Sequence, residues 1–231
     1  MAKPLPWSHT SLTEFVSCPK QFYHKRVVKD VVEEKGAQQL WGINVHKAFE
    51  DRQATKVPLP IDLQEHEPYM AKIEAWEGHF FTEQKIALDK RGRPVNNFFD
   101  PDVWYRGVID WTKLVGKTAR IIDYKTGKKK EKWEQLMMNA IWTFLTYPEI
   151  DVVDARFYWT VDKTESRKVW GRAEMEMLWG FFIGDLRQYA EAFKSETWQP
   201  RPSGLCAKWC SVLTCDHNGR RKGGKYERWK P

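Results

Sequence analysis

The middle of the chain has a side-chain pattern that differs from the pattern on either side of it. Two segments, Trp104 to Trp111 and Ala119 to Tyr124, are rich in β-branched and aromatic residues, and Gly116-Lys117 lies between them. This composition is typical of two strands joined by a turn. Three further segments are predicted to be strands on the same grounds: Gln84 to Leu88, Ala155 to Val161 and Arg167 to Ala173. The centre of the chain therefore predicts a β-sheet.

Segments with helical spacing lie on both sides of these strands. The predicted helices are Ser8 to Val28 (broken at Pro19), Gln38 to Arg52, Tyr69 to Thr82, Glu131 to Tyr147 and Glu174 to Lys194. Ser11-Leu12-Thr13-Glu14 fits a capping box in the first helix, and the proline-rich stretch from Lys56 to Pro68 is predicted to be a loop. Strands flanked by helices indicate an α/β or α+β domain.

Composition narrows the class of protein and of partner. With 231 residues, of which 42% are hydrophobic and 30% charged, the chain is expected to fold around a real core. Lys and Arg outnumber Asp and Glu by 38 to 31, which gives a net charge of +7 and favours nucleic acid, then anionic membrane, as a partner. No stretch approaches the roughly 18 apolar residues of a membrane helix, and residues 1–6 lack the apolar core of a secretory signal. A cytoplasmic protein is expected.

Two carboxylates and an amine are expected to meet on the predicted sheet. Asp110 follows Gly107 on the first strand, and Asp123 and Lys125 lie on the next strand. Side chains alternate along a strand, so Asp123 and Lys125 project from one face, and pairing across the turn would bring Asp110 beside Asp123. Two neighbouring carboxylates stay ionised only when a cation neutralises them, and oxygen ligands suit Mg²⁺ or Mn²⁺.

A helix upstream carries a histidine that fits the same site. Gly42, His46 and Glu50 are spaced four residues apart and therefore share one helix face. The small residue at position 42 would let another part of the backbone approach the helix one turn before His46. An imidazole beside two carboxylates favours Mn²⁺, with Mg²⁺ as the other candidate.

Each of these patterns is weak alone, but their order along the chain resembles one family. A histidine helix, a Gly-X-X-Asp strand, a turn, an Asp-X-Lys strand and a helix that carries Gln135 resemble the RecB-like branch of the PD-(D/E)XK nuclease superfamily. The resemblance extends from Ser11 to Cys215, and its matching blocks are Cys18-Pro19, Gly42/His46/Glu50, Gly107/Asp110, Asp123-Tyr124-Lys125-Thr126-Gly127 and Gln135-Leu136. It implies a restriction-endonuclease-like core, which is a central mixed sheet flanked by helices.

The resemblance also implies roles for individual residues. It makes His46, Asp110 and Asp123 metal ligands, with the Tyr124 carbonyl as a fourth. Lys125 would be the catalytic lysine, supported by Gln135 from the following helix. The family often has a tyrosine four residues after this glutamine, where the present chain has Asn139. Glu50 and Glu83 are weaker supporting candidates, because each is as well explained as a surface charge.

Four cysteines form a second candidate metal site. Cys206, Cys210 and Cys215 form a compact group, and Cys18 is remote in sequence. Four thiolates can bind a 4Fe–4S cluster or a structural Zn²⁺, and His217 could replace one of them around zinc. One N-terminal and three C-terminal cysteines resemble the iron–sulfur site of AddB-type nucleases and of the CRISPR adaptation nuclease. Here, however, Cys210 follows Cys206 by four positions rather than three. Unliganded thiols are the remaining alternative.

The expected organisation is a single nuclease domain over residues 1–215. It would comprise an N-terminal helical part (about 8–82), a catalytic sheet (about 83–173) and a C-terminal helix with the cysteines (about 174–215), which the iron–sulfur cluster would clip to the N-terminal helices. Residues 216–231 are Gly-rich and basic and are expected to form a flexible tail. The run Lys128-Lys129-Lys130 could contact DNA or could simply be a solvated surface.

The leading hypothesis is a metal-dependent DNA exonuclease in recombination, repair or end processing, of a phage or CRISPR-adaptation type. Gly116-Lys117-Thr118 does not complete a nucleotide-binding loop, so unwinding would need a partner. Candidate partners are DNA, a helicase, a recombinase or annealing protein, and a CRISPR adaptation protein. Two alternatives remain open, which are a catalytically silent DNA-binding module and a zinc-stabilised RNA-binding protein. The sequence leaves the polarity of cleavage and the oligomeric state open.

Overall fold

The computed structural model describes residues 4–220. These residues form two compact units, each of which is described by itself. Residues 35–181 form one unit, which we call the sheet unit. Residues 4–34 and 182–220 belong to the other, which we call the terminal unit. The proposed single domain over residues 1–215 stays a prediction.

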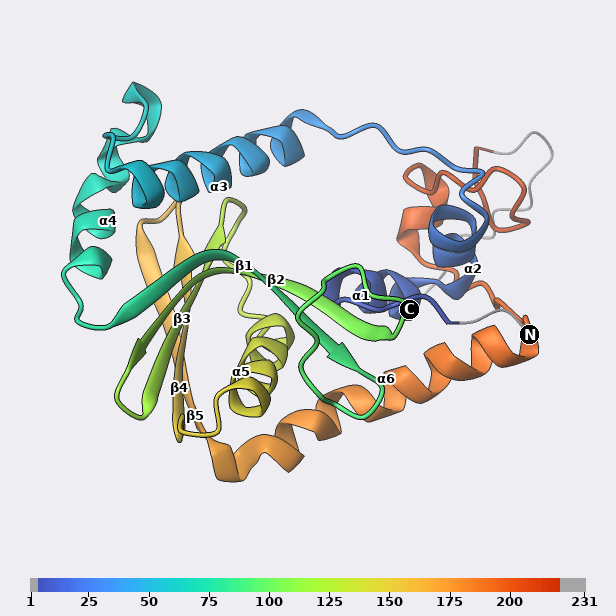
Figure 1. Cartoon of the computed structure of the whole chain (residues 1–231). Coiled ribbons are helices and arrows are strands. Elements are labelled where there is room, and N and C mark those ends of the chain that lie inside the picture. Colours follow the sequence, from blue (N-terminus) through green and yellow to red (C-terminus); the bar gives the residue numbers. More distant parts are fainter. Residues whose placement is uncertain (1–3, 221–231) are drawn as a thin grey trace. The chain divides into compact units, whose positions relative to one another are not determined.

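The sheet unit contains a five-stranded mixed sheet whose strands lie in chain order (Figure 1). The strands are β1 (His79–Asp89), β2 (Val103–Val115), β3 (Thr118–Lys125), β4 (Val152–Trp159) and β5 (Thr164–Gly171). All neighbours are antiparallel except β3 and β4, which are parallel. A parallel pair needs a long crossover, and α5 (Glu134–Thr146) supplies it. The predicted mixed sheet flanked by helices is confirmed.

Helices cover both faces of the sheet. On one face, α3 (Ala37–Thr55) and α4 (Glu67–Glu74) bury Val45, Phe49, Met70 and Ile73 in one core cluster with Trp111, Ile122, Tyr124 and Tyr158 of the strands. On the other face lies α5, which is buried along most of its length from Leu136 to Phe144. Helices on both sides make the sheet interior dry, so charged groups there keep little of their hydration.

The predicted helix from Tyr69 to Thr82 is wrong in its second half. Helix α4 ends at Glu74, and β1 begins at His79. Gly78 lies between them, just before β1, with φ +112°, a conformation that glycine adopts without strain. The predicted loop from Lys56 to Pro68 also contains a short 3₁₀ helix, Ile61–His66.

The terminal unit is built from short helices around aromatic side chains. It contains α1 (His9–Ser17), α2 (Pro19–Phe22), a π-helix (Tyr23–Val28), a 3₁₀ turn (Gly204–Ala207) and the part of α6 (Met175–Ser195) from Phe182 onward. Phe15 contacts Phe22 and Tyr189 edge-on, with ring centroids 5.7 and 5.2 Å apart, and Trp198 stacks on Phe22 at 5.9 Å. The aromatic richness of the chain here serves packing.

The N-terminal cap differs from the prediction. Ser8, not Ser11, is the N-cap of α1: the Ser11 amide donates to Ser8 Oγ at 3.1 Å, and the Ser8 amide donates to Ser11 Oγ at 2.8 Å. Glu14 instead accepts two bonds from the Arg26 guanidinium, at 2.7 and 2.8 Å. A hydroxyl at the third helical position has replaced the expected carboxylate.

No helix within residues 4–220 has the length and apolarity needed to cross a membrane. The predicted tail lies partly outside the described residues, since residues 221–231 are not described.

Two glycines give a stability test of this fold. Gly116 has φ +52° and open space around its Cα, so Gly116→Ala should cost about 1 kcal/mol of unfolding free energy from backbone strain alone. A Cβ at Gly78 would overlap the Leu114 carbonyl oxygen, so Gly78→Ala should cost more, on the order of 3 kcal/mol. Urea denaturation measures both values. Equal losses for the two variants would contradict the close approach of Gly78 to β2.

Candidate metal-binding active site

The register of β2 and β3 brings the two predicted carboxylates together. The last paired residues are Trp111 and Ile122, and the next residues along the two strands are Asp110 and Asp123. At this point the Tyr124 amide donates to Asp110 Oδ2 at 2.7 Å. Asp110 and Asp123 are only 8% and 2% exposed. The sheet thus holds two carboxylates side by side, almost out of contact with water.

Lys125 and Gln135 form a bonded set with Asp123. The Lys125 ammonium lies 2.6 Å from Asp123 Oδ2 and donates to Gln135 Oε1 at 2.7 Å. The Gln135 amide in turn donates to Asp123 Oδ1. Gln135 lies in the first turn of α5, so the crossover helix that closes the parallel pair also fixes the lysine. The side chain of Lys125 remains 31% exposed and can therefore meet a ligand.

His46 reaches the same place from α3. Its Nδ1 lies 3.4 Å from Asp110 Oδ2. One turn earlier, a Cβ on Gly42 would come within 2.9 Å of Thr126 Oγ1, so the small residue does allow a close approach. The approaching group is a side chain of the segment after β3, whereas a backbone approach was expected.

Glu83 joins this cluster through an unusual backbone conformation. Its φ is +46°, although it lies within β1 between Thr82 and Gln84, which pair with Trp111 and Ile109 of β2. Glu83 therefore sits beside Asp110. A non-glycine residue in this region stores roughly 1–3 kcal/mol of strain, and such residues gather at functional sites.

Three of these side chains bring possible metal-ligand atoms close together. One from each of His46, Glu83 and Asp110 lies within 4.8 Å of the others. Glu50 differs from Glu83, because it pairs with Lys47 at 3.0 Å. Of the two weaker candidates, the structure therefore places Glu83 in the cluster and Glu50 in a surface ion pair.

The cluster holds an excess of buried negative charge, which shifts the pKa values of its members. Burial raises the pKa of Glu83 to about 7, helped by the charge of Asp110. Burial and Asp110 also raise the pKa of Asp123, which Lys125 opposes. Burial alone would lower the pKa of His46, but Asp110, Asp123 and Glu83 raise it to about 9. A proton on the imidazole thus offsets charge that a cation could offset instead.

The donor set fits a hard divalent cation. His46, Glu83, Asp110 and Asp123 supply carboxylate oxygens and one imidazole nitrogen, which suits Mg²⁺ or Mn²⁺. Binding such a cation would displace the imidazole proton, because only the neutral ring ligates a metal. The Tyr124 ring is buried against Phe49 at 4.9 Å, and the ligand role of its carbonyl stays a prediction.

Lys128, Lys129 and Lys130 lie on the exposed segment after β3. Lys129 is 3.5 Å from Glu131. Their contact with DNA stays a prediction.

The four predicted cysteines lie in the terminal unit as free thiols. Cys18 Sγ accepts the Arg201 amide at 3.4 Å, and Cys206 Sγ accepts the Ser203 amide at 3.4 Å. Burial raises the pKa of Cys210, a Val212 hydrogen bond lowers it, and the charges of Cys206, Cys18 and Cys215 raise it again. Among the described residues, the cysteines do not form a group of ligand atoms within 4.8 Å as His46, Glu83 and Asp110 do, so a metal site made of them stays a prediction.

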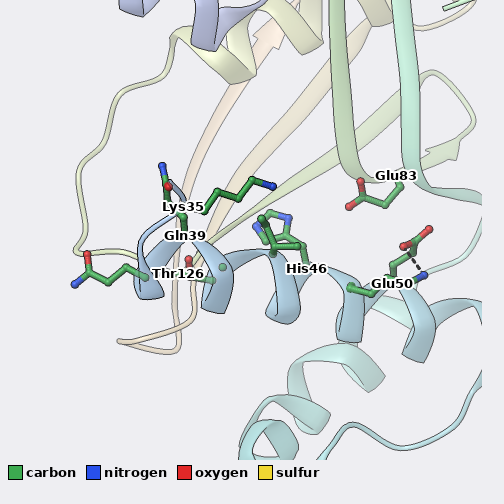
Figure 2. A pocket seen from close by; sticks show the side chains of 10 residues that line it. Lys35, Gln39, His46, Glu50, Glu83 and Thr126 are labelled. Atoms are coloured by element: carbon green, nitrogen blue, oxygen red, sulfur yellow. Dashed lines mark hydrogen bonds and ion pairs between the residues drawn. The ribbon is translucent and has the colours of Figure 1, made fainter. Parts of the chain in front are cut away.

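A groove of about 740 Å³ runs along α3 to the carboxylate cluster (Figure 2). His46, Glu83 and Glu50 line it. So do Thr126, which belongs to the matching block after Asp123, and residues that the sequence did not single out, which are Lys35, Gln38, Gln39, Ile43 and Lys47. For Gln39 and Ile43 the available signal was their position seven and three residues before His46, because residues at such spacing share a helix face.

The comparisons with known proteins agree with this geometry. The chain aligns with the crystal structure of a predicted exonuclease from Eubacterium rectale at 14% identity and a TM-score of 0.52, over 88% of this chain and 86% of that one. The structure of SSO0001 aligns at 12% identity and a TM-score of 0.43, over 94% and 89%, which is too low to support an argument. No curated protein matches at a significant level. Residues 6–215 match the PD-(D/E)XK nuclease superfamily. The chain therefore belongs to the PD-(D/E)XK nuclease superfamily.

Proposed function

We propose that this chain is a DNA exonuclease that depends on Mg²⁺ or Mn²⁺ and hydrolyses phosphodiester bonds. The observation that carries the proposal is the group formed by half-buried His46 and Glu83 with buried Asp110. Buried Asp123 lies beside it, with the Lys125 ammonium 2.6 Å away. Nucleases of this superfamily use divalent metals, and the donor set fits one. An exonuclease is favoured because the structurally similar protein from E. rectale carries that description.

Each residue of the cluster would have its own role in the reaction. His46, Asp110, Asp123 and Glu83 would hold the metal, which supplies a Lewis acid for the phosphate and a more acidic water. Lys125 would orient the attacking water and offset the charge that builds on phosphorus. Gln135 positions Lys125, because it bonds both the ammonium and Asp123. Burial of the carboxylates would strengthen their attraction for the metal and for Lys125, because little water is present to screen the charges.

A role in recombination, repair or CRISPR adaptation remains part of the proposal, as do a helicase, a recombinase and an adaptation protein as partners. A silent DNA-binding module is the alternative. It is disfavoured because a mere scaffold would not need buried carboxylates and a strained Glu83. The alternative of a zinc-stabilised RNA-binding protein depends on whether the cysteines bind zinc.

We further propose that Cys18, Cys206, Cys210 and Cys215 hold a 4Fe–4S cluster with a structural role. One thiol from the end of α1 and three from a loop-rich C-terminal segment belong to the same unit, where burial and the other three thiols raise the pKa of Cys210. Four thiolates are the ligand set of such a cluster. Zinc is the competing metal. The cluster would tie the two chain ends of the terminal unit together.

Loss of Lys125 or Asp110 should abolish the reaction while the fold survives. Lys125→Ala and Asp110→Asn should each lower kcat at least about 10²–10³-fold, because the first removes the positive charge beside the phosphate and the second weakens the hold on the metal. Anaerobically purified protein would be incubated with end-labelled linear DNA and with closed circles, with and without Mn²⁺. Asp151→Asn is the control, because Asp151 lies in a surface pair with Lys117. Wild-type rates in Lys125→Ala would refute the assignment, and cleavage of circles would refute the exonuclease mode.

Glu83 and Glu50 provide a matched test of the metal site. Glu83→Gln should weaken Mn²⁺ binding, measured by calorimetry, on the order of 10-fold or more, because it removes a ligand. Glu50→Gln should leave binding within about twofold, since Glu50 lines the same groove but lies outside the ligand group. Equal effects of the two substitutions would remove Glu83 from the site.

The cysteine site has a visible readout. Anaerobically purified protein should be brown, contain iron and sulfide and show broad visible absorbance that Cys18→Ser abolishes. Losing the cluster should also destabilise the terminal unit, because metal ligation contributes folding free energy. A colourless protein with stoichiometric zinc would overturn the iron–sulfur assignment.

A further inference from the structure

One side of the groove along α3 is lined by residues that have no role in the proposed catalytic cluster. Ile43 is 48% exposed although it is aliphatic, and it lines the groove one turn before Lys47. Gln38 and Gln39 lie in the preceding turn and also line the groove. From Gln38 to Asn44 no residue of α3 is buried, so this half of the helix presents its side chains freely.

A cation lies at the end of the groove that is remote from Glu50. Lys35 forms no ion pair with any of the described residues. Figure 2 shows its ammonium extending over the groove toward His46 and Glu83. In contrast, Lys47 is paired with Glu50 and Asp51 at 3.0 and 2.7 Å. One positive charge is therefore available for an anion that lies beside the metal ligands.

We propose that this groove binds an unstacked nucleotide of a single strand next to the scissile phosphate, with Ile43 against its base and Lys35 on a neighbouring phosphate. The inference rests on the proposed nuclease function, because His46 and Glu83 belong to both the groove and the metal-binding cluster. It adds the substrate class, which that function leaves open.

The chemistry of this side of the groove decides between single strands and duplexes. Inside a duplex the faces of the bases are stacked on one another, so away from the terminal pair a protein meets only phosphates, sugars and base edges. An aliphatic side chain can cover a base face only when the base is unstacked. The Gln39 amide can donate to or accept from any base edge, so the groove fits single strands without strong sequence preference.

Ile43 and Leu40 form a matched pair for the test. They are 48% and 49% exposed on the same helix, but only Ile43 lines the groove. Ile43→Ala should lower kcat/KM on a single-stranded oligonucleotide about 10-fold, as expected when a base loses its packing partner. Leu40→Ala should stay within about twofold of wild type, and on blunt duplex the two variants should not differ.

A strand whose terminal residues lack bases tests the proposed contact between Ile43 and a base. Wild type should cleave the first bond of such a strand about 10-fold more slowly, and Ile43→Ala should cause no further loss, because the partner base is already absent. In addition, Lys35→Gln should flatten the dependence of log Kd on log salt by about 0.7 for a single strand.

Several results would overturn the proposal. They are equal effects of Ile43→Ala and Leu40→Ala, an Ile43→Ala loss that persists on the abasic strand, and an equal loss on duplex. If wild type cleaves no DNA with Mn²⁺, the nuclease function fails, and the groove is then tested by fluorescence anisotropy of a labelled single strand with Ca²⁺. Weaker binding by Ile43→Ala than by Leu40→Ala supports the groove in that case, and equal binding refutes it.

Discussion

The pairing of β2 with β3 is the interaction on which the site depends. These strands are antiparallel from Trp111 and Ile122 to Val115 and Thr118, and the residues just beyond the last pair are Asp110 and Asp123. A slip by one residue would turn each side chain to the opposite face. Trp111 and Ile122 are buried under α3 and α4, so the core fixes the register and the register fixes the carboxylates.

The site stores unfavourable energy that the rest of the sheet unit sustains. Two carboxylates are buried together, Glu83 has a strained backbone and the Gly42 contact leaves no room for a larger residue. Lys125 offsets part of the charge, and the Tyr124 amide bonds Asp110. An arrangement of this kind persists only where the surrounding packing holds it, and here that packing comes from the aromatic and aliphatic core beneath α3.

The two units differ in what stabilises them. The sheet unit has a continuous apolar core and a complete hydrogen-bonded sheet, which together account for its order. The terminal unit has short helices and a C-terminal segment in which the only helical element past α6 in the described residues is one 3₁₀ turn. A metal bound by the four cysteines, as proposed above, would replace the contacts that a short, irregular segment cannot make.

Sequence by itself determined the mixed sheet with its flanking helices, the segments that became β2, β3, α3 and α5, and the prediction that His46 and Asp110 lie together. It could do so because β-branched runs, helical spacing and a Gly-X-X-Asp and Asp-X-Lys order are local signals. Only the tertiary structure decided that Glu83 joins His46 and Asp110 while Glu50 does not. It also ended α4 at Glu74 and moved the N-cap to Ser8. Glu83 joins the cluster through one backbone angle and through strands remote in the chain, which no local pattern of residue types encodes. The Ser8 cap does have a local signal in Ser8-X-X-Ser11, but it competes with Ser11-X-X-Glu14, and Glu14 is taken by Arg26.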